Sequence, residues 1–473
     1  MSTFSGLNTA YSGLVAARYG LDVTGQNITN SSTNGYTRQR VMTSAVGGVA
    51  TTGMFTGGIR VGQGVSVDGI ARMGDDHLDA QVRFTAGAAA YTAVRANGLK
   101  TMEASLHEPG KDGLSADLGN FWAAWQELSK SVGETAQSGL LLGQAKTLAT
   151  HIASNYKAVD RQWSDARDMV TGAVAELNEA AAGVAELNGR IRSTLAADGN
   201  VNELLDQRSV LTSTIAALTG GSVRQLADGT VDVLVGGNAL VSGTTVHNLS
   251  VAGSTQMDAV AGNPVRLVWT DRPGVPVSVD GGEIAGGLSL LAPVNGGAGG
   301  ALAEAAAAYN GFAVELANKV NAIHSTGFTP GGTPGGNFFA YGAAANAATT
   351  LTVIPTSGAE IASGSSPIVG KDGSNADKIA QLATGPNSPN KSWTQVVTNI
   401  GVATKAELRQ ASLANLAATS AVGLQLSNSG VSLDEENVNL LMFQHAYQGA
   451  ARVMTAVDEM LDTLINRTGL VGR

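Results

Sequence analysis

The chain of 473 residues contains no cysteine. Disulfides, thiolate metal sites and cysteine nucleophiles are therefore excluded. This absence suits a protein that leaves the cell without oxidative folding, although drift in composition explains it equally well. Aromatic residues make up only 5 % of the chain, whereas glycine reaches 61 residues. We expect cores rich in alanine, leucine and valine, divided over roughly two to four domains.

Basic residues are also in the minority, with a formal net charge of −9 spread over the chain. A nucleic-acid-binding protein would show a basic stripe, so we expect no nucleic-acid partner. No apolar run approaches the roughly 18 residues that a membrane-spanning helix needs, and we expect no membrane insertion. The N-terminus has no basic segment before Arg18 and no clear cleavage site, which argues against a cleaved secretory signal.

Recognisable catalytic and metal-binding motifs are missing. The six histidines form no H-E-x-x-H or similar metal spacing, and the sequence has neither a G-x-S-x-G elbow nor a P-loop. Residues 371–377 resemble a calcium loop only loosely, without its register or its distal glutamate, and are expected to form a surface turn. We therefore predict no catalytic residue, no cofactor, no metal and no enzyme.

Both ends of the chain carry helical patterns. Apolar positions alternate at intervals of three and four near the N-terminus, a heptad seam with departures at Arg18 and Gly25, and turn residues 30–35 end it. At the C-terminus, Ser432 and Glu435 form a capping-box pattern before an unbroken seam. The N-terminal seam comprises Phe4, Leu7, Tyr11, Leu14, Arg18, Leu21, Gly25 and Ile28. The C-terminal seam comprises Leu440, Phe443, Tyr447, Ala450, Met454, Val457, Leu461 and Leu464.

Neither terminal helix is expected to be stable alone. Burying about eight side chains yields about 16 kcal/mol, whereas ordering about 25 residues costs about 25–50 kcal/mol before hydrogen bonds are counted. The ends could pair with each other, with other copies, or with both. Residues 1–60 carry a net charge of +3 and residues 431–473 a net charge of −3, which favours adjoining ends. The alternative is that both are ordinary amphipathic helices of one globular core.

Between the two ends, the sequence pattern changes several times between helical and strand-like. We predict a β-hairpin within 41–75, helices over 75–107 and after the EPGKDG break, and helix over 140–218 with weak points at Asn188-Gly189 and at 198–200. Residues 222–295 show short strands punctuated by glycine and asparagine. Helices follow over 301–327 and 395–425, separated by an irregular region over 328–392 with a strand-like run at 350–354 and a short helix at 375–382.

These patterns predict an α+β multi-domain protein. A long, coiled-coil-like helical domain would carry paired terminal helices and an inserted small all-β domain. The predicted boundaries are 1–40 with 430–473 for the terminal helices, 41–220 with 300–429 for the mainly helical body, and 221–299 for the β domain.

Residues 21–41, LDVTGQNITNSSTNGYTRQRV, resemble the N-I-x-N-x-x-T-x-G-[YF] signature of bacterial flagellar axial proteins, the rod, hook and hook-associated families. The following T-R-Q is similar to the hook-associated protein 1 family. Residues 429–466 resemble the C-terminus of the same family, with L-D-E-E and F-Q-x-A-Y-Q segments. Further matches are EPGKDGLSADLGNFW, NELLDQR at 202–208 and ANKVNAIHSTG at 317–327. The segment SVGETAQSGLLLG departs from the family by lacking a proline and an arginine.

The resemblance implies a structural, self-assembling component of the flagellum at the hook–filament junction, required for filament assembly and motility. Its implied partners are copies of itself, the hook protein, hook-associated protein 3 and an export chaperone on the C-terminal helix. It implies secretion through the flagellar type III apparatus with an uncleaved N-terminus. The terminal helices would form an inner tube and be disordered before assembly. Because the chain is short for the family, an additional outer domain is expected to be absent.

The resemblance and the seams together give a set of candidate assembly residues. Arg38 and Gln39 either bind a neighbouring subunit or are solvated. The N-terminal candidates are Leu7, Tyr11, Leu14, Leu21, Asn27, Ile28, Asn30, Thr33, Gly35, Tyr36, Arg38 and Gln39. The C-terminal candidates are Leu433, Leu440, Phe443, Tyr447, Met454, Val457, Leu461 and Leu464.

Two alternatives to this function stay open. One is another axial protein, such as hook-associated protein 3, the hook or the distal rod, which the T-R-Q and L-D-E-E segments disfavour. The other is a secreted enzyme or adhesin with a β-rich insert, which would need a polar cleft within 222–392.

Overall fold

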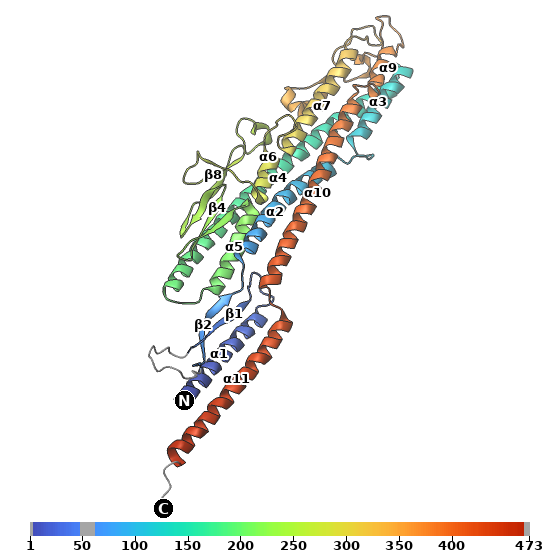
Figure 1. The fold of residues 1–473 in the computed structure, drawn as a ribbon. Helices are drawn as coiled ribbons and strands as arrows, with labels where there is room; N and C mark the ends of the chain where they lie inside the picture. Colours follow the sequence, from blue (N-terminus) through green and yellow to red (C-terminus); the bar gives the residue numbers. More distant parts are fainter. Residues whose placement is uncertain (1–2, 48–61, 468–473) are drawn as a thin grey trace, which may run out of the picture.

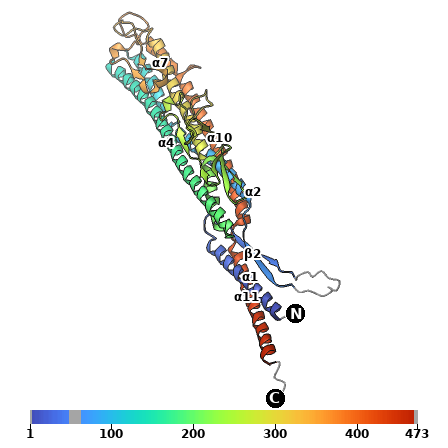
Figure 2. The same ribbon diagram turned by 90° about the vertical axis from the view of Figure 1, so that its left-hand side faces the viewer.

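The computed structural model describes residues 3–47 and 62–467, and within these the protein is an elongated rod (Figures 1 and 2). Both termini lie at one end of the rod, where the first and last helices run side by side. The expected α+β architecture is confirmed: long helices form the rod, and small antiparallel sheets lie along it.

The terminal region consists of two helices and a hairpin. Helix α1 (Thr3–Thr29) ends at the predicted turn, and the hairpin pairs β1 (Gln39–Ala45) with β2 (Val65–Arg72) in antiparallel register. The last helix, α11 (Leu433–Asp462), continues into a π-helical turn (Thr463–Arg467). Ser432 caps α11 by accepting from the backbone N–H of Glu435, which is the first half of the predicted capping box.

Long helices make up the body of the rod. They are α2 (Asp76–Ser105), α3 (Leu114–Lys130), α4 (Thr135–Ala196), α5 (Asn202–Thr219), α6 (Gly282–Leu291), α7 (Ala301–His324) and α10 (Pro389–Ser429). At the end distal to the termini, aromatic side chains fill the core between α3, α7 and α10. Phe121, Trp125, Phe338 and Trp393 are fully buried there, and their rings contact one another or neighbouring aromatic rings.

Two sheets form the insert beside α4. One orders β3 (Ser222–Gln225), β4 (Val231–Val235), β5 (Asn238–Ser242) and β6 (Thr245–Val246), and the other orders β7 (Leu249–Ala252), β8 (Arg266–Trp269) and β9 (Pro276–Val277). The prediction of strands up to residue 295 is wrong at its C-terminal end. Residues 282–291 form helix α6, whose apolar residues Ile284, Leu290 and Leu291 are buried in the helical body.

The predicted weak point at Asn188-Gly189 is also wrong, because α4 continues through it. The Asn188 side chain is fully buried and bonds across to the insert. Its Nδ2 donates to the carbonyls of Val231 at 2.8 Å and Gly243 at 2.6 Å, and its Oδ1 accepts from Val231 N and Arg208. Ten residues earlier on the same helix, Asn178 holds Leu249 through two similar bonds. Asn188 thus ties α4 to one sheet of the insert, and Asn178 ties it to the other. The predicted break at 198–200 is confirmed.

The distal irregular region contains short elements only, including β10 (Phe339–Ala340), α8 (Ala347–Thr350), β11 (Thr352–Val353) and α9 (Ser374–Ala380). His324, at the end of α7, ties this region to the rod. Its Nδ1 lies 2.7 Å from the carbonyl of Gly336, and its Nε2 accepts from the N–H of Ala362 at 2.9 Å. These partners fix a neutral imidazole with the proton on Nδ1. Burial lowers the pKa of His324 below its ordinary value.

Candidate assembly site

The two terminal helices pack antiparallel along a seam of small residues. The Cβ position of Gly6 lies 3.6 Å from Val457, that of Gly13 lies 3.9 Å from Ala450, and that of Gly20 falls on the ring of Phe443. Between these glycines, Ala10 and Ala17 are buried. Because these residues are small, the backbone of α1 approaches α11 closely.

The contact of α1 with α11 therefore lies one residue away from the predicted α1 seam, whose role toward other copies stays a prediction. The predicted positions Leu7, Leu14, Leu21 and Ile28 are half-buried, and Tyr11 is 58 % exposed. The prediction selected the large apolar residues of α1, but the two helices approach most closely where the side chains are smallest. The two apparent departures lie off the contact face as well. Arg18 is exposed and lies 4.0 Å from Asp22, and the Cβ position of Gly25 meets no atom within 4 Å.

On α11 the predicted seam faces α1. Val457 is buried, and Leu440, Phe443, Met454 and Leu461 are half-buried. Three other candidates are more open, namely Leu433, Tyr447 and Leu464. The helix pair thus covers only part of the apolar surface of α11.

A second apolar stripe on α11 is exposed to solvent. Its large members, Val438, Met442, Val453 and Met460, are each more than half exposed. Ala446, Gly449 and Ala456 continue the stripe between them and are also exposed. The intervals of three and four place all seven on one face, next to the face that contacts α1. Exposed apolar rows of this kind are unusual on a soluble monomer.

The residues of the N-terminal signature form a polar joint at the base of the helix pair, centred on the buried side chain of Asn27. Its Nδ2 donates to the carbonyl of Gln39 at 2.9 Å and to Glu436 Oε2 at 3.1 Å. Its Oδ1 accepts from the N–H of Gln39 at 3.0 Å and from the Tyr36 hydroxyl at 2.9 Å. One asparagine therefore links the end of α1, the start of the hairpin and the start of α11.

Arg38 and Glu436 form the charged part of this joint. Arg38 Nε donates to Glu436 Oε1 at 2.8 Å and Nη2 lies 2.7 Å from the same oxygen, while Nη1 donates to Glu435 at 2.8 Å. The side chain of Glu436 is 2 % exposed and that of Glu435 is 63 % exposed. The Arg38 N–H also donates to the carbonyl of Ser429 at the end of α10. Arg38 is thus bound within its own chain.

The turn that leads into the joint explains two more signature residues. Gly35 has a φ of +78°, and its Cβ position lies 2.3 Å from Val210 Cγ2, so a side chain is excluded by conformation and by space. Thr33 Oγ1 donates to Asn30 Oδ1 within the turn. Burial raises the pKa of Tyr36 to about 12, with smaller effects from the charges of Asp206 and Glu436.

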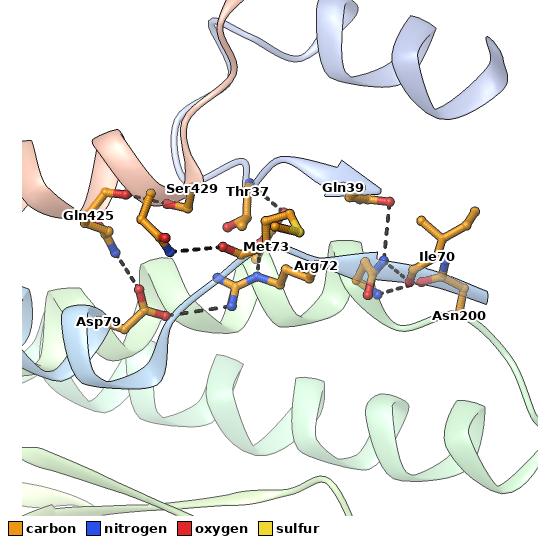
Figure 3. Close-up of polar contacts among 12 residues, drawn as sticks. Thr37, Gln39, Ile70, Arg72, Met73, Asp79, Asn200, Gln425 and Ser429 are labelled. Carbon is orange, nitrogen blue, oxygen red and sulfur yellow. Dashed lines mark hydrogen bonds and ion pairs between the residues drawn. The ribbon is translucent and has the colours of Figure 1, made fainter. Parts of the chain in front are cut away.

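The body contributes a second layer to the joint, shown in Figure 3. Asp206 on α5 accepts from the Thr37 N–H at 3.1 Å and from Arg72 Nε at 2.6 Å. Arg72 also lies 3.7 Å from Asp79 on α2, which accepts from Gln425 on α10 at 2.6 Å. One chain of contacts therefore runs from the signature segment through β2 into α2, α5 and α10.

The remaining signature residue, Gln39, is also held inside the joint. It is buried, and its Oε1 accepts from Asn202 Nδ2 at 3.3 Å (Figure 3). Asn202 Nδ2 donates as well to the carbonyl of Ile70, at 2.9 Å. Arg38 and Gln39 are thus bound within the chain and not simply solvated, while a bond to a neighbouring subunit stays a prediction.

Several joint residues were not among the sequence candidates, namely Arg72, Asp79, Asn202, Asp206, Gln425 and Glu436. The matches NELLDQR and L-D-E-E contained Asn202, Asp206 and Glu436, but only as family resemblance. Asn27 and Glu436 are 409 positions apart, so no local pattern could pair them. The clue that the sequence offered was that these polar residues lie within segments that resemble the family.

No group of three or more histidine, cysteine or acidic side chains in residues 3–47 and 62–467 is arranged to hold a metal ion. None of the helices in those segments is long and apolar enough to cross a membrane.

Comparison with known proteins gives a consistent result. Residues 99–339 match the helical domain of the flagellar hook-associated protein FlgK, and residues 425–467 match the C-terminal family of flagellar basal body rod proteins FlgEFG. The chain is 30 % identical to flagellar hook-associated protein 1 of Bacillus subtilis over 509 aligned positions, covering 100 % of both chains.

More distant relatives agree. The corresponding protein of Salmonella typhimurium is 26 % identical, with 80 % of this chain and 62 % of that protein covered. The solved structure of the flagellar hook junction protein FlgK from Burkholderia pseudomallei has the same fold, with a TM-score of 0.62 at 14 % identity, over 75 % of this chain and 100 % of that one.

Proposed function

The chain belongs to the family of flagellar hook-associated protein 1, and we propose from this that it is a structural subunit of the junction between flagellar hook and filament. Its role is to assemble with copies of itself and to join the hook protein on one side to hook-associated protein 3 on the other. The observation that carries an assembly role is the exposed apolar stripe on α11, beside a helix pair that protrudes from the body.

We further propose a division of labour between the terminal residues. The signature residues Asn27, Tyr36, Arg38 and Gln39 set the angle between the helix pair and the body, and so act within one subunit. The apolar faces of α1 and α11 make the contacts between subunits and form the inner layer of the tube. The support for this division is that the polar groups are already paired in one chain, whereas much apolar surface remains open.

The helix pair is also the part of the chain suited to export. Its seam is built largely from glycine and alanine on the α1 side, which bury little apolar area. We propose that the pair is weakly held in the free chain and ordered on assembly, so that the chain passes the flagellar type III apparatus unfolded. An export chaperone would cover α11 until then, since exposed apolar stripes favour aggregation.

Deletion of the gene followed by electron microscopy tests the junction role. Cells are expected to build hooks without filaments, to release flagellin into the medium and to lose swimming. A plasmid copy of the gene should restore all three. Normal filaments in the deletion strain would exclude the proposed function.

A further inference from the structure

A hollow of about 550 Å³ lies between α1 and the hairpin. Tyr11, Val15 and Tyr19 line it from α1, and Val67 and Ile70 line it from β2. Apolar and aromatic side chains thus stand on both walls, and Ser12, Asp68 and Asn200 add polar groups to the lining. The ring of Tyr11 also borders a second hollow of about 400 Å³, together with Leu7, Asn8 and Met454. Tyr11 borders both hollows, and we name the surface that they form on α1 and on the facing side of β2 the α1 groove.

We infer that the α1 groove receives the exposed stripe of α11 from a second copy of this chain. The inference rests on the proposed function and specifies which two surfaces meet. The stripe repeats at the same three–four spacing as the seam that already packs on α1, so it can lie along a second helix in the same way. Small residues at its centre, Ala446, Gly449 and Ala456, allow close approach. The methionines toward its ends adapt to an irregular groove.

Charge agrees with this pairing. Arg452 is the one lysine or arginine of α11, stands beside Val453 of the stripe and is exposed. Asp68 is the one charged residue among those lining the groove on the hairpin side. Glu459 stands beside Met460 in the same way, so the stripe is flanked by both signs of charge, and only a register that places Arg452 near Asp68 brings opposite charges together. This favours register and orientation more than affinity.

The geometry also fits a tube. Groove and stripe are different patches of one surface, so each subunit offers its stripe to one neighbour and its groove to another. Such a heterologous contact continues from copy to copy, as a closed ring or an open helical array, whereas contact of the stripe with another stripe would end as a dimer.

The absence of cysteine gives a clean test by cross-linking. Val67→Cys is combined in turn with Met442→Cys, Val453→Cys and Met460→Cys, and each gene replaces the natural one. Isolated flagella are oxidised and separated without reductant. We expect at least one combination to give a ladder of cross-linked multimers, since a disulfide forms where Cβ atoms lie about 3.5–4.5 Å apart. The matched control pairs Val67→Cys with Gln448→Cys, on a different, polar face of α11, and should stay monomeric.

Two results would overturn the inference. One is a dimer from Val453→Cys alone, which would mean that the stripe packs on itself. The other is the absence of any ladder in strains that swim and carry filaments. That second result would leave the proposed function intact, because the junction role fails only if deletion of the gene leaves filaments in place.

A second measurement does not depend on disulfide geometry. Val453→Asp should abolish swimming, because it places a carboxylate in an apolar interface, whereas Gln448→Asp should leave swimming unchanged. Equal swimming in the two strains would count against the inference. Gly13→Cys with Ala450→Cys serves as the internal standard, since their Cβ positions are 3.9 Å apart and the link should form within one chain.

Discussion

The joint predicts unequal effects for the same substitution at two neighbouring residues. Glu436 is buried and accepts from both Arg38 and Asn27, whereas Glu435 is exposed and accepts from Arg38 alone. Glu436→Gln keeps the shape of the side chain but removes its charge and replaces one acceptor oxygen by a donor. Removing one partner of a buried pair costs about 3–5 kcal/mol, and the remaining amide oxygen restores part of this. We expect the opening free energy of the joint to fall by about 2–3 kcal/mol.

For Glu435→Gln the expected loss is about 0–1 kcal/mol, as for other exposed ion pairs. Hydrogen exchange reports the difference, since the backbone N–H groups of Thr37, Arg38 and Gln39 all donate within the joint. Because about 1.4 kcal/mol corresponds to a factor of ten, their exchange should accelerate about 30- to 150-fold in Glu436→Gln and less than about tenfold in Glu435→Gln. Similar rates in the two variants would refute the assignment of Glu436 as the buried partner.

Three further predictions concern the rest of the chain. Asn188→Ala should lower the free energy of unfolding by about 2–4 kcal/mol, measured by chemical denaturation, because buried groups of the insert lose their partners. Gly20→Ala should speed amide exchange across α1, since its Cβ meets Phe443 and overpacking costs about 1–3 kcal/mol. Gly25→Ala should slow amide exchange across α1, because alanine favours helix by about 1 kcal/mol over glycine. Equal exchange rates in the two variants would contradict the assignment of Gly20 to the contact with α11. Because the pKa of His324 is lowered in the fold, its stabilising contribution is present above about pH 6.5 and lost as the pH falls below it. The free energy of unfolding, measured in urea, should therefore fall more steeply with decreasing pH for the wild type than for His324→Gln.

The arrangement of the joint bears on how one chain meets two demands. If the chain is exported and assembled as proposed, its ends must be loose in the first state, and the helix pair must be set at a defined angle to the body in the second. A polar network with partners from α1, α5, α10 and α11 satisfies both. Its hydrogen bonds and ion pairs are directional and define one geometry. In the unfolded chain the same groups are solvated by water, so this segment exposes little apolar surface.

The sequence by itself determined the helices, the hairpin, the strand-rich insert and the family. Helical periods, turn residues such as those at 30–35, and short strands between glycines are local features, and local features decide which element forms. The N-terminal signature also located the joint, because the segment 27–39 forms its centre.

Only the tertiary structure decided which faces meet and which polar groups pair. The sequence pattern placed the α1 seam on Leu7 and Leu14, whereas the contact lies on Gly6, Gly13 and Gly20, since close packing depends on the shape of the partner helix. It marked Asn188 as a break, whereas strands brought alongside α4 give its side chain four bonds. An apolar stripe in a sequence indicates a surface suited to packing. Whether its partner comes from the same chain or from another copy is a property of the folded surface.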